Sequence, residues 1–249
     1  MGKRARNKQR VGDNVLFMDE QDHLFENSYH KNTRRNSSPN SKYRKNIVAK
    51  TDGQSHLLRA IDESDIVFAV GPAGTGKTYL AIAKAVEALL NDEVERIILT
   101  RPAVEAGEKL GFLPGDMEDK LDPYLRPLYD ALLERVDSKK LEIMLRHKVI
   151  EIAPVGFMRG RTLSNAYIVI DEAQNCTESQ LKMLLTRLGW NSTMIITGDP
   201  DQSDLEKDAS GLKGISDRLA GKIDRLSVCK LDKADVVRHP LVSKLLDII

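Results

Sequence analysis

The central part of the chain alternates short apolar runs with longer amphipathic stretches. The apolar runs are rich in Ile and Val, which is typical of parallel strands that are buried on both faces. They predict strands at 66–70, 96–100, 148–153, 167–171 and 193–197, with a further candidate at 226–231. Helical periodicity predicts helices at 77–90, 117–136, 138–146, 178–188 and 211–220, and a C-terminal helix from 241 to 249. Because strands and helices alternate, we expect an α/β fold with a doubly wound, mostly parallel sheet.

The N-terminal segment differs in composition from the rest of the chain. Residues 1–45 contain eleven Lys and Arg against five Asp and Glu, a balance of 11 − 5 = +6, whereas the whole chain carries +1. The remainder therefore carries 1 − 6 = −5. We predict a basic, largely disordered tail over 1–45 and one folded domain over 46–249. A basic tail suits an anionic partner such as nucleic acid, but it is equally typical of a solvated arm.

Cysteine content and hydropathy bear on the compartment. The two cysteines, Cys176 and Cys229, form no CxxC motif, which fits a reducing compartment. No apolar run approaches the roughly 18–20 residues that span a bilayer. The basic N-terminus is not followed by the apolar segment of a secretory signal. We therefore expect a cytoplasmic protein with no membrane partner.

The stretch "GPAGTGKT" directly follows a predicted strand and opens a predicted helix. It matches G-x-x-x-x-G-K-[ST], in which backbone amides and a helix N-terminus cradle phosphate groups. Lys77 supplies a charge for the β- and γ-phosphates, and Thr78 supplies a hydroxyl for Mg²⁺. The predicted nucleotide-binding residues are Gly71, Pro72, Ala73, Gly74, Thr75, Gly76, Lys77 and Thr78. The alternative is a tight glycine turn with no ligand.

Two carboxylates end the apolar run "YIVIDEAQ". Ligands of parallel sheets bind at the carboxyl ends of the strands, so Asp171 is placed to hold Mg²⁺. Glu172 points differently and is a candidate to orient or deprotonate an attacking water. The same pair also suits a helix N-cap followed by a first-turn acid.

A third strand end, in "TMIITGDPDQ", carries Thr197, Asp199 and Gln202. We expect them near a γ-phosphate, where a glutamine can sense the state of the nucleotide. The alternative is a Gly-Asp-Pro turn without a chemical role.

Together, the motifs "GPAGTGKTYLA", "RPAVEAGEKLGFLPGD", "FMRGRTL", "IDEAQN", "TGDPDQ" and "VVRHPLV" resemble the PhoH-like family of P-loop ATPases over about residues 47 to 249. This resemblance implies a RecA-like domain that binds and hydrolyses ATP with Mg²⁺. It also implies a link to RNA or other single-stranded nucleic acid, and ring-shaped oligomers.

The resemblance places two further residues. Gln54 stands where related ATPases read adenine with a glutamine, and otherwise it is a residue on the surface of a helix. Arg238 resembles the arginine of a late helicase motif that contacts the γ-phosphate, and otherwise it is a surface charge.

Assembly follows from a comparison with helicases that have two RecA-like domains in one chain. Here one phosphate loop and one acidic strand end make half of such a composite site, so another chain must supply an arginine finger. A head-to-tail interface that closes makes a ring. We therefore predict a homo-oligomer, most simply a hexamer. The candidate arginines are Arg238, Arg101, Arg126, Arg159 and Arg161.

The segment "FMRGRTLSNA" is basic and carries one aromatic residue, Phe157. Arg159 and Arg161 are candidates to grip a nucleic-acid backbone, with Phe157 stacking on a base. They suit a γ-phosphate or a neighbouring subunit equally well. The leading interpretation is an ATPase coupled to nucleic acid, and the alternative is a slow nucleotide-dependent switch that acts through protein partners. Glu172 beside Asp171 favours attack by water and disfavours a kinase.

Overall fold

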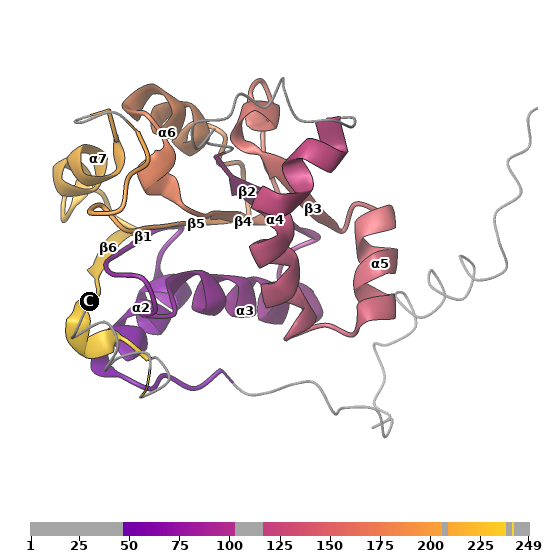
Figure 1. The fold of residues 1–249 in the computed structure, drawn as a ribbon, viewed down its shortest axis with the longest axis horizontal. Coiled ribbons are helices and arrows are strands. Elements are labelled where there is room, and N and C mark those ends of the chain that lie inside the picture. The colour runs from indigo at the N-terminus through magenta and orange to yellow at the C-terminus, as the bar shows by residue number, and fades with distance from the viewer. Residues whose placement is uncertain (1–46, 103–116, 206–208, 238–240, 242–249) are drawn as a thin grey trace, which may run out of the picture. The chain divides into compact units, whose positions relative to one another are not determined.

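The computed structural model describes residues 47–102, 117–205, 209–237 and 241, and these residues contain a six-stranded sheet (Figure 1). Every strand pairing in the sheet is parallel, and the strand order is β3-β2-β4-β5-β1-β6. The strands are β1 (Ile66–Val70), β2 (Arg96–Arg101), β3 (Ile150–Pro154), β4 (Ala166–Ile170), β5 (Thr193–Gly198) and β6 (Leu226–Lys230). The tail predicted over 1–45 lies outside the described residues.

Helices cover both faces of the sheet (Figure 1). On one face lie α2 (Asp52–Glu63), α3 (Lys77–Leu90), α4 (Met117–Leu133) and α5 (Ser138–Arg146). On the other lie α6 (Glu178–Leu185), α7 (Leu212–Leu219) and the short helices η2 (Val155–Met158) and η3 (Ala173–Asn175). A last short helix, η4 (Lys233–Asp235), follows β6. None of the helices in the described part of the chain is long and apolar enough to span a bilayer.

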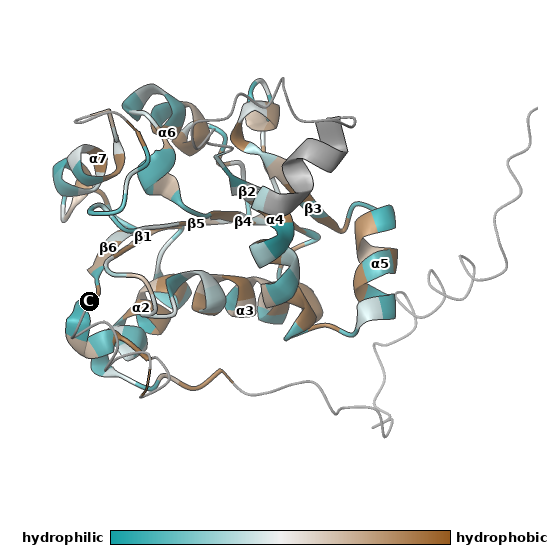
Figure 2. Cartoon of the chain, in the orientation of Figure 1, coloured by the Kyte–Doolittle hydropathy of each residue, from teal (hydrophilic) through white to brown (hydrophobic). Residues whose placement is uncertain are grey.

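The strands divide their side chains between two hydrophobic layers. On β4, Tyr167 and Val169 belong to the layer under α3, whereas Ile168 and Ile170 belong to the layer under α6. All five residues of β4 are buried, as expected for a central parallel strand. In Figure 2 the hydrophobic colour runs along the central strands.

The register brings three strand ends to one edge of the sheet. Ile170 at the end of β4 pairs with Ile196 on β5, and Val70 at the end of β1 pairs with Gly198. The phosphate loop, the acidic pair and the Gly-Asp-Pro segment follow these strands directly. The sequence motifs therefore meet at the carboxyl edge.

The predicted α/β fold with a parallel sheet is confirmed, with shifts at the element ends. Strand β3 begins at Ile150, because Lys148 has a left-handed backbone (φ 57) that interrupts the extended run. Helix α6 ends at Leu185, because the backbone that follows it forms a bridge between Leu188 and Leu163.

Helix α2 is not among the elements that periodicity predicts. Its start is marked by an N-cap, in which the Thr51 hydroxyl accepts a hydrogen bond from the backbone N–H of Gln54. The helix predicted from 241 to 249 lies outside the described residues, apart from Leu241.

Candidate functional site

The phosphate loop joins β1 to α3 with backbone conformations that favour glycine. Gly76, the N-cap of α3, has φ 83, in the left-handed region. Gly71 has φ 147, and a Cβ atom there would lie 2.3 Å from the Leu231 carbonyl oxygen. The loop therefore makes a tight turn into α3. The free N–H groups at the N-terminus of α3 are available to an anion bound in the loop.

Lys77, the first residue of α3, is buried beside this loop. Its ammonium donates to the carbonyl oxygens of Gly71 at 2.6 Å and Pro72 at 2.7 Å. Burial lowers the pKa of Lys77, and nearby carboxylates, Asp199 foremost, act in the opposite direction. The Lys77 amino group therefore lies next to the acidic strand ends, with Asp199, Glu172 and Asp171 all close enough to act on its pKa.

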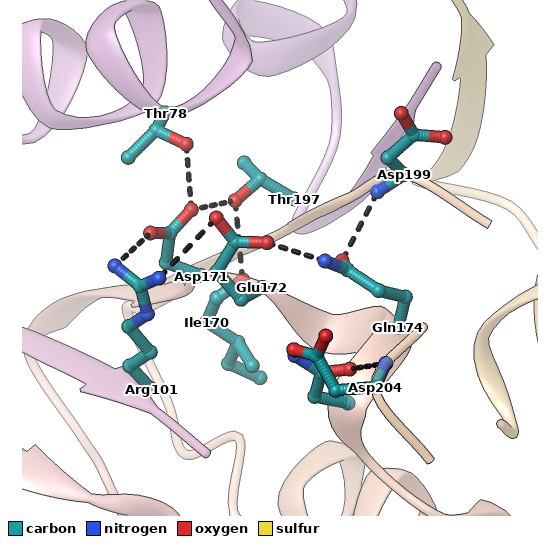
Figure 3. Close-up of polar contacts among 10 residues, drawn as sticks. Thr78, Arg101, Ile170, Asp171, Glu172, Gln174, Thr197, Asp199 and Asp204 are labelled. Carbon is teal, nitrogen blue, oxygen red and sulfur yellow. Dashed lines mark hydrogen bonds and ion pairs between the residues drawn. The ribbon is translucent and has the colours of Figure 1, made fainter. Parts of the chain in front are cut away.

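Asp171 follows β4 and is 4% exposed. Its Oδ1 atom accepts from the hydroxyls of Thr78 at 2.6 Å and Thr197 at 2.7 Å (Figure 3). A carboxylate and a hydroxyl side by side are oxygen ligands of the kind that Mg²⁺ takes. The residues predicted to hold a metal, Thr78 and Asp171, are therefore in contact, and their chemistry fits that ion.

Glu172 occupies the left-handed region of the backbone, with φ 52 and ψ 41. Such a conformation is unfavourable for a residue with a Cβ atom and is concentrated at functional sites. It turns the Glu172 carboxylate toward the cavity, where it accepts from the Gln174 amide. An Arg101 nitrogen lies 3.5 Å from Glu172, and another lies 3.9 Å from Asp171 (Figure 3).

Gln174 is a site residue that the sequence interpretation missed. It is 2% exposed and connects Glu172 to the segment that follows β5, because its Oε1 atom accepts from the backbone amide of Asp199 at 3.0 Å. Next to it, the Asn175 side chain forms two hydrogen bonds of 2.8 Å with Asp204. The sequence does hold a sign of this role, because two amide residues follow the acidic pair within three positions. Amide side chains in a segment that packs against the core need hydrogen-bond partners there.

The phosphate loop, Lys77, the Thr78–Asp171 pair and Glu172 line one cavity of about 260 Å³. Its lining comprises Ala73, Gly74, Gly76, Lys77, Thr78, Tyr79, Asp171, Glu172, Gly198, Asp199 and Gln202. The structure thus brings the phosphate loop, the acidic pair and Gln202 together. A phosphate chain entering this cavity would meet backbone amides, the Lys77 side chain and the Thr78–Asp171 pair.

Gln54 lies behind the phosphate loop, and its side chain is buried. Its Nε2 atom donates to the Thr75 carbonyl at 3.0 Å, and its Oε1 atom accepts from the Lys50 amide at 2.8 Å. Gln54 is not part of the cavity lining given above. In this structure it braces the loop from α2.

The candidate arginines occupy different settings. Arg101 contacts the carboxylates of its own chain's site. Arg161 forms a two-pronged pair with Glu151 at 2.6 and 2.7 Å, which lowers the pKa of Glu151. Arg126 and Arg159 are exposed.

Arg238 lies outside the described residues. The residue before it, Val237, donates its amide to the Gly74 carbonyl of the phosphate loop at 3.0 Å. Phe157, predicted to stack on a base, is 61% exposed on η2.

The chain matches the profile of the family described as PhoH-like protein over residues 46–249. It is 54% identical to a PhoH-like protein of Bacillus subtilis (strain 168) over 224 residues, which are 90% of this chain and 68% of that protein. It is 45% identical to Protein PhoH of Escherichia coli (strain K12) over 203 residues, 80% of this chain and 57% of that protein. The chain therefore spans somewhat more than half of the length of these relatives.

Among solved structures, similarity is weaker. The Pif1 helicase of Candida albicans matches 81% of this chain and 43% of its own, with a TM-score of 0.38 and 16% identity. The SWI2/SNF2 ATPase core of Sulfolobus solfataricus, in complex with dsDNA, matches 61% and 32%, with a TM-score of 0.40 and 17% identity. The family match and the close relatives carry the assignment: the chain belongs to the PhoH-like protein family.

Proposed function

We propose that the chain binds ATP with Mg²⁺ and hydrolyses it, and that RNA or another single-stranded nucleic acid stimulates this activity. One observation carries the first part of the proposal. The phosphate loop with Lys77, the Thr78–Asp171 pair and Glu172 line a single cavity at the carboxyl edge of a parallel sheet. That combination suits a phosphate chain on one side and an attacking water on the other.

The roles of the binding residues follow from their contacts. The loop amides and the N-terminus of α3 bind phosphate oxygens, and Lys77 exchanges the carbonyls of Gly71 and Pro72 for them. Thr78 and Asp171 would hold Mg²⁺, which neutralises charge on the phosphates when bound. ATP is proposed over other nucleotides from the resemblance of the sequence motifs to P-loop ATPases.

Glu172 is proposed to orient and deprotonate the attacking water. Its carboxylate lines the cavity and is held by Gln174, so its position is defined without a ligand. Asp199 and Gln202, in the segment after β5, line the same cavity and are proposed to report the presence of the γ-phosphate.

Coupling to nucleic acid is supported by charge and exposure. Residues 1–45 carry a balance of +6, which favours a polyanionic partner. Phe157 and Arg159 are both exposed near η2 and supply a stacking ring and a phosphate contact.

The first experiment measures phosphate release from ATP by the purified chain, with and without single-stranded RNA and with and without Mg²⁺. Lys77→Ala serves as the background. We expect Mg²⁺-dependent release that RNA raises several-fold and that Lys77→Ala abolishes. Release by Lys77→Ala at the unsubstituted rate would contradict the assignment of the site.

A second candidate function is a slow nucleotide-dependent switch that acts through protein partners. The contacts of Glu172 favour it, because Arg101 and Gln174 both engage the carboxylate that must act on water. A low rate of phosphate release that RNA leaves unchanged would support this alternative over the leading one.

A further inference from the structure

A second cavity, of about 820 Å³, lies at the amino edge of the sheet, opposite the nucleotide site. Residues near the starts of β1, β2, β4, β5 and β6 contribute to it, together with the loop between α6 and β5. Its lining comprises Asp65, Ala88, Glu93, Val94, Thr162, Tyr167, Leu188, Gly189, Trp190, Asn191, Ser192, Thr193 and Arg225. We call it the amino-edge groove. None of the residues assigned to nucleotide chemistry takes part in it.

Trp190 is the most exposed large hydrophobic residue in the described part of the chain, at 87%. It is also the only tryptophan in the sequence. Its carbonyl oxygen accepts from the Asn165 amide at 2.9 Å and the Ser192 hydroxyl at 3.2 Å, so its backbone is anchored. An indole exposed to water on a hydrogen-bonded stretch of backbone offers a stacking surface for a ligand.

Tyr167 provides a second, independent sign of a ligand. Tyr167 is 4% exposed, and its buried hydroxyl has no hydrogen-bond partner among the described residues. A buried hydroxyl without a partner is unfavourable, and buried polar groups are nearly always satisfied. Because Tyr167 lines the amino-edge groove, a ligand that enters it can supply the missing hydrogen bond.

The charges of the groove select the kind of ligand. Three lining residues are ionised: Asp65, Glu93 and Arg225. Arg225 pairs with Asp65 through two hydrogen bonds of 2.7 and 2.6 Å, so these two charges compensate each other. Glu93 remains as the lining charge that no described cation balances, and the groove is acidic.

The charged groups around Tyr167 are also mostly negative. Burial raises the pKa of Tyr167, and the charges of Asp62, Glu93 and Glu87 raise it further. Lys84 pairs with Asp62 at 2.7 Å and Glu87 at 2.6 Å and offsets part of that field. A polyanion gains no attraction here, whereas a cation does.

We propose that the amino-edge groove binds an arginine side chain from a basic segment of a protein partner. The planar guanidinium stacks on Trp190, donates an N–H to the Tyr167 hydroxyl and pairs with the Glu93 carboxylate. Arginine fits better than lysine because its flat, multiply donating head suits stacking and hydrogen bonding together. The chemistry required is thus a stacking face, a hydrogen-bond acceptor and an anion within one groove.

The single tryptophan makes the test direct, because the intrinsic tryptophan fluorescence of the whole chain reports on this groove. The probes are acetylated, amidated hexa-arginine, the matching hexa-lysine and a single-stranded oligoribonucleotide. We expect saturable fluorescence change with hexa-arginine, weaker binding of hexa-lysine and no change at Trp190 with the oligoribonucleotide. A change with the oligoribonucleotide at lower concentration than with hexa-arginine would overturn the proposal.

Variants separate the groove from general attraction to an acidic domain. With a labelled hexa-arginine probe, Trp190→Ala should weaken binding by roughly tenfold, the size of a cation–π contact. Tyr167→Phe and Glu93→Gln should each weaken it by a smaller factor. The controls are Phe157→Ala, an exposed aromatic elsewhere, and Glu142→Gln, an exposed acid on α5, which should leave binding unchanged. Equal binding by Trp190→Ala and the unsubstituted chain would refute the proposal.

Discussion

Glu172 illustrates how a single residue combines an unfavourable backbone with a defined chemical position. Its left-handed conformation is offset by the packing of Ala173 and Gln174, which follow it and are buried. Its carboxylate contacts Gln174 on one side and Arg101 on the other. The left-handed backbone at Glu172 lowers local stability, and unfavourable backbone conformations of this kind are concentrated at functional sites.

At Glu172 the proposed function makes a specific prediction. Glu172→Gln keeps the shape of the side chain but removes the base, so ATP should still bind while turnover falls by roughly 10²- to 10⁴-fold. Nucleotide affinity and phosphate release should be measured on the same preparation. Glu178→Gln is a matched control, since Glu178 is an exposed acid on α6 that pairs with Arg218. Turnover at the unsubstituted rate in Glu172→Gln would show that another group activates the water.

Gln54 is the residue where the sequence resemblance and the observed contacts suggest different roles. Removing its amide in Gln54→Ala leaves the Thr75 carbonyl and the Lys50 amide without their partner. We expect a loss of about 1–3 kcal/mol in the free energy of unfolding. The phosphate loop binds the phosphate groups that ATP and GTP share. The affinity for the two nucleotides should therefore fall by similar factors.

Equilibrium binding of the two nucleotides to Gln54→Ala distinguishes the roles. A loss confined to ATP, with unchanged stability, would instead support the adenine contact that the resemblance implies.

At the scale of elements, the strands and the phosphate loop were predictable, but the links between them were not. Near-continuous apolar runs mark buried parallel strands, and the spacing of "GPAGTGKT" depends on local backbone geometry alone. The bridge from Gln174 to Asp199 joins residues on separate elements, so no local pattern encodes it. The pairing of Arg161 with Glu151 was hidden for the same reason.

Helix α7 offers a test of such non-local packing through two glycines. A Cβ atom on Gly211 would lie 2.5 Å from the Glu178 backbone, which cannot move aside, whereas one on Gly214 meets nothing within 4 Å. Gly211→Ala should therefore destabilise the fold by about 1–3 kcal/mol. Gly214→Ala, inside α7, should stabilise the fold by about 0.5–1 kcal/mol, whereas Gly211 is the N-cap of that helix.

Urea unfolding followed by circular dichroism compares the two glycine variants. If Gly211→Ala were as stable as Gly214→Ala, the close approach of α7 to the start of α6 would not describe the protein in solution.

At the scale of the whole molecule, the central question is how a site with one phosphate loop is completed. The described residues place Arg101 in its own chain's site and pair Arg161 with Glu151. Arg159 is exposed, and Arg238 follows a residue whose amide contacts the phosphate loop. Arg126 is exposed as well, so Arg126, Arg159 and Arg238 stay the candidates to act on a neighbouring subunit of the proposed homo-oligomer.

Mixing two inactive variants tests that proposal directly. Lys77→Ala disables a chain's own site but leaves its arginine intact, and Arg159→Ala or Arg238→Ala does the reverse. In a head-to-tail assembly, an arginine variant whose neighbour is Lys77→Ala regains a complete composite site. The mixture should therefore hydrolyse ATP faster than either variant alone, by an amount that depends on the mixing ratio. If the arginine acts within its own chain, or if the protein is monomeric by sedimentation, every ratio will give only the sum of the separate rates. Recovery with Arg238→Ala and none with Arg159→Ala would identify the residue, because both variants remove the same charge.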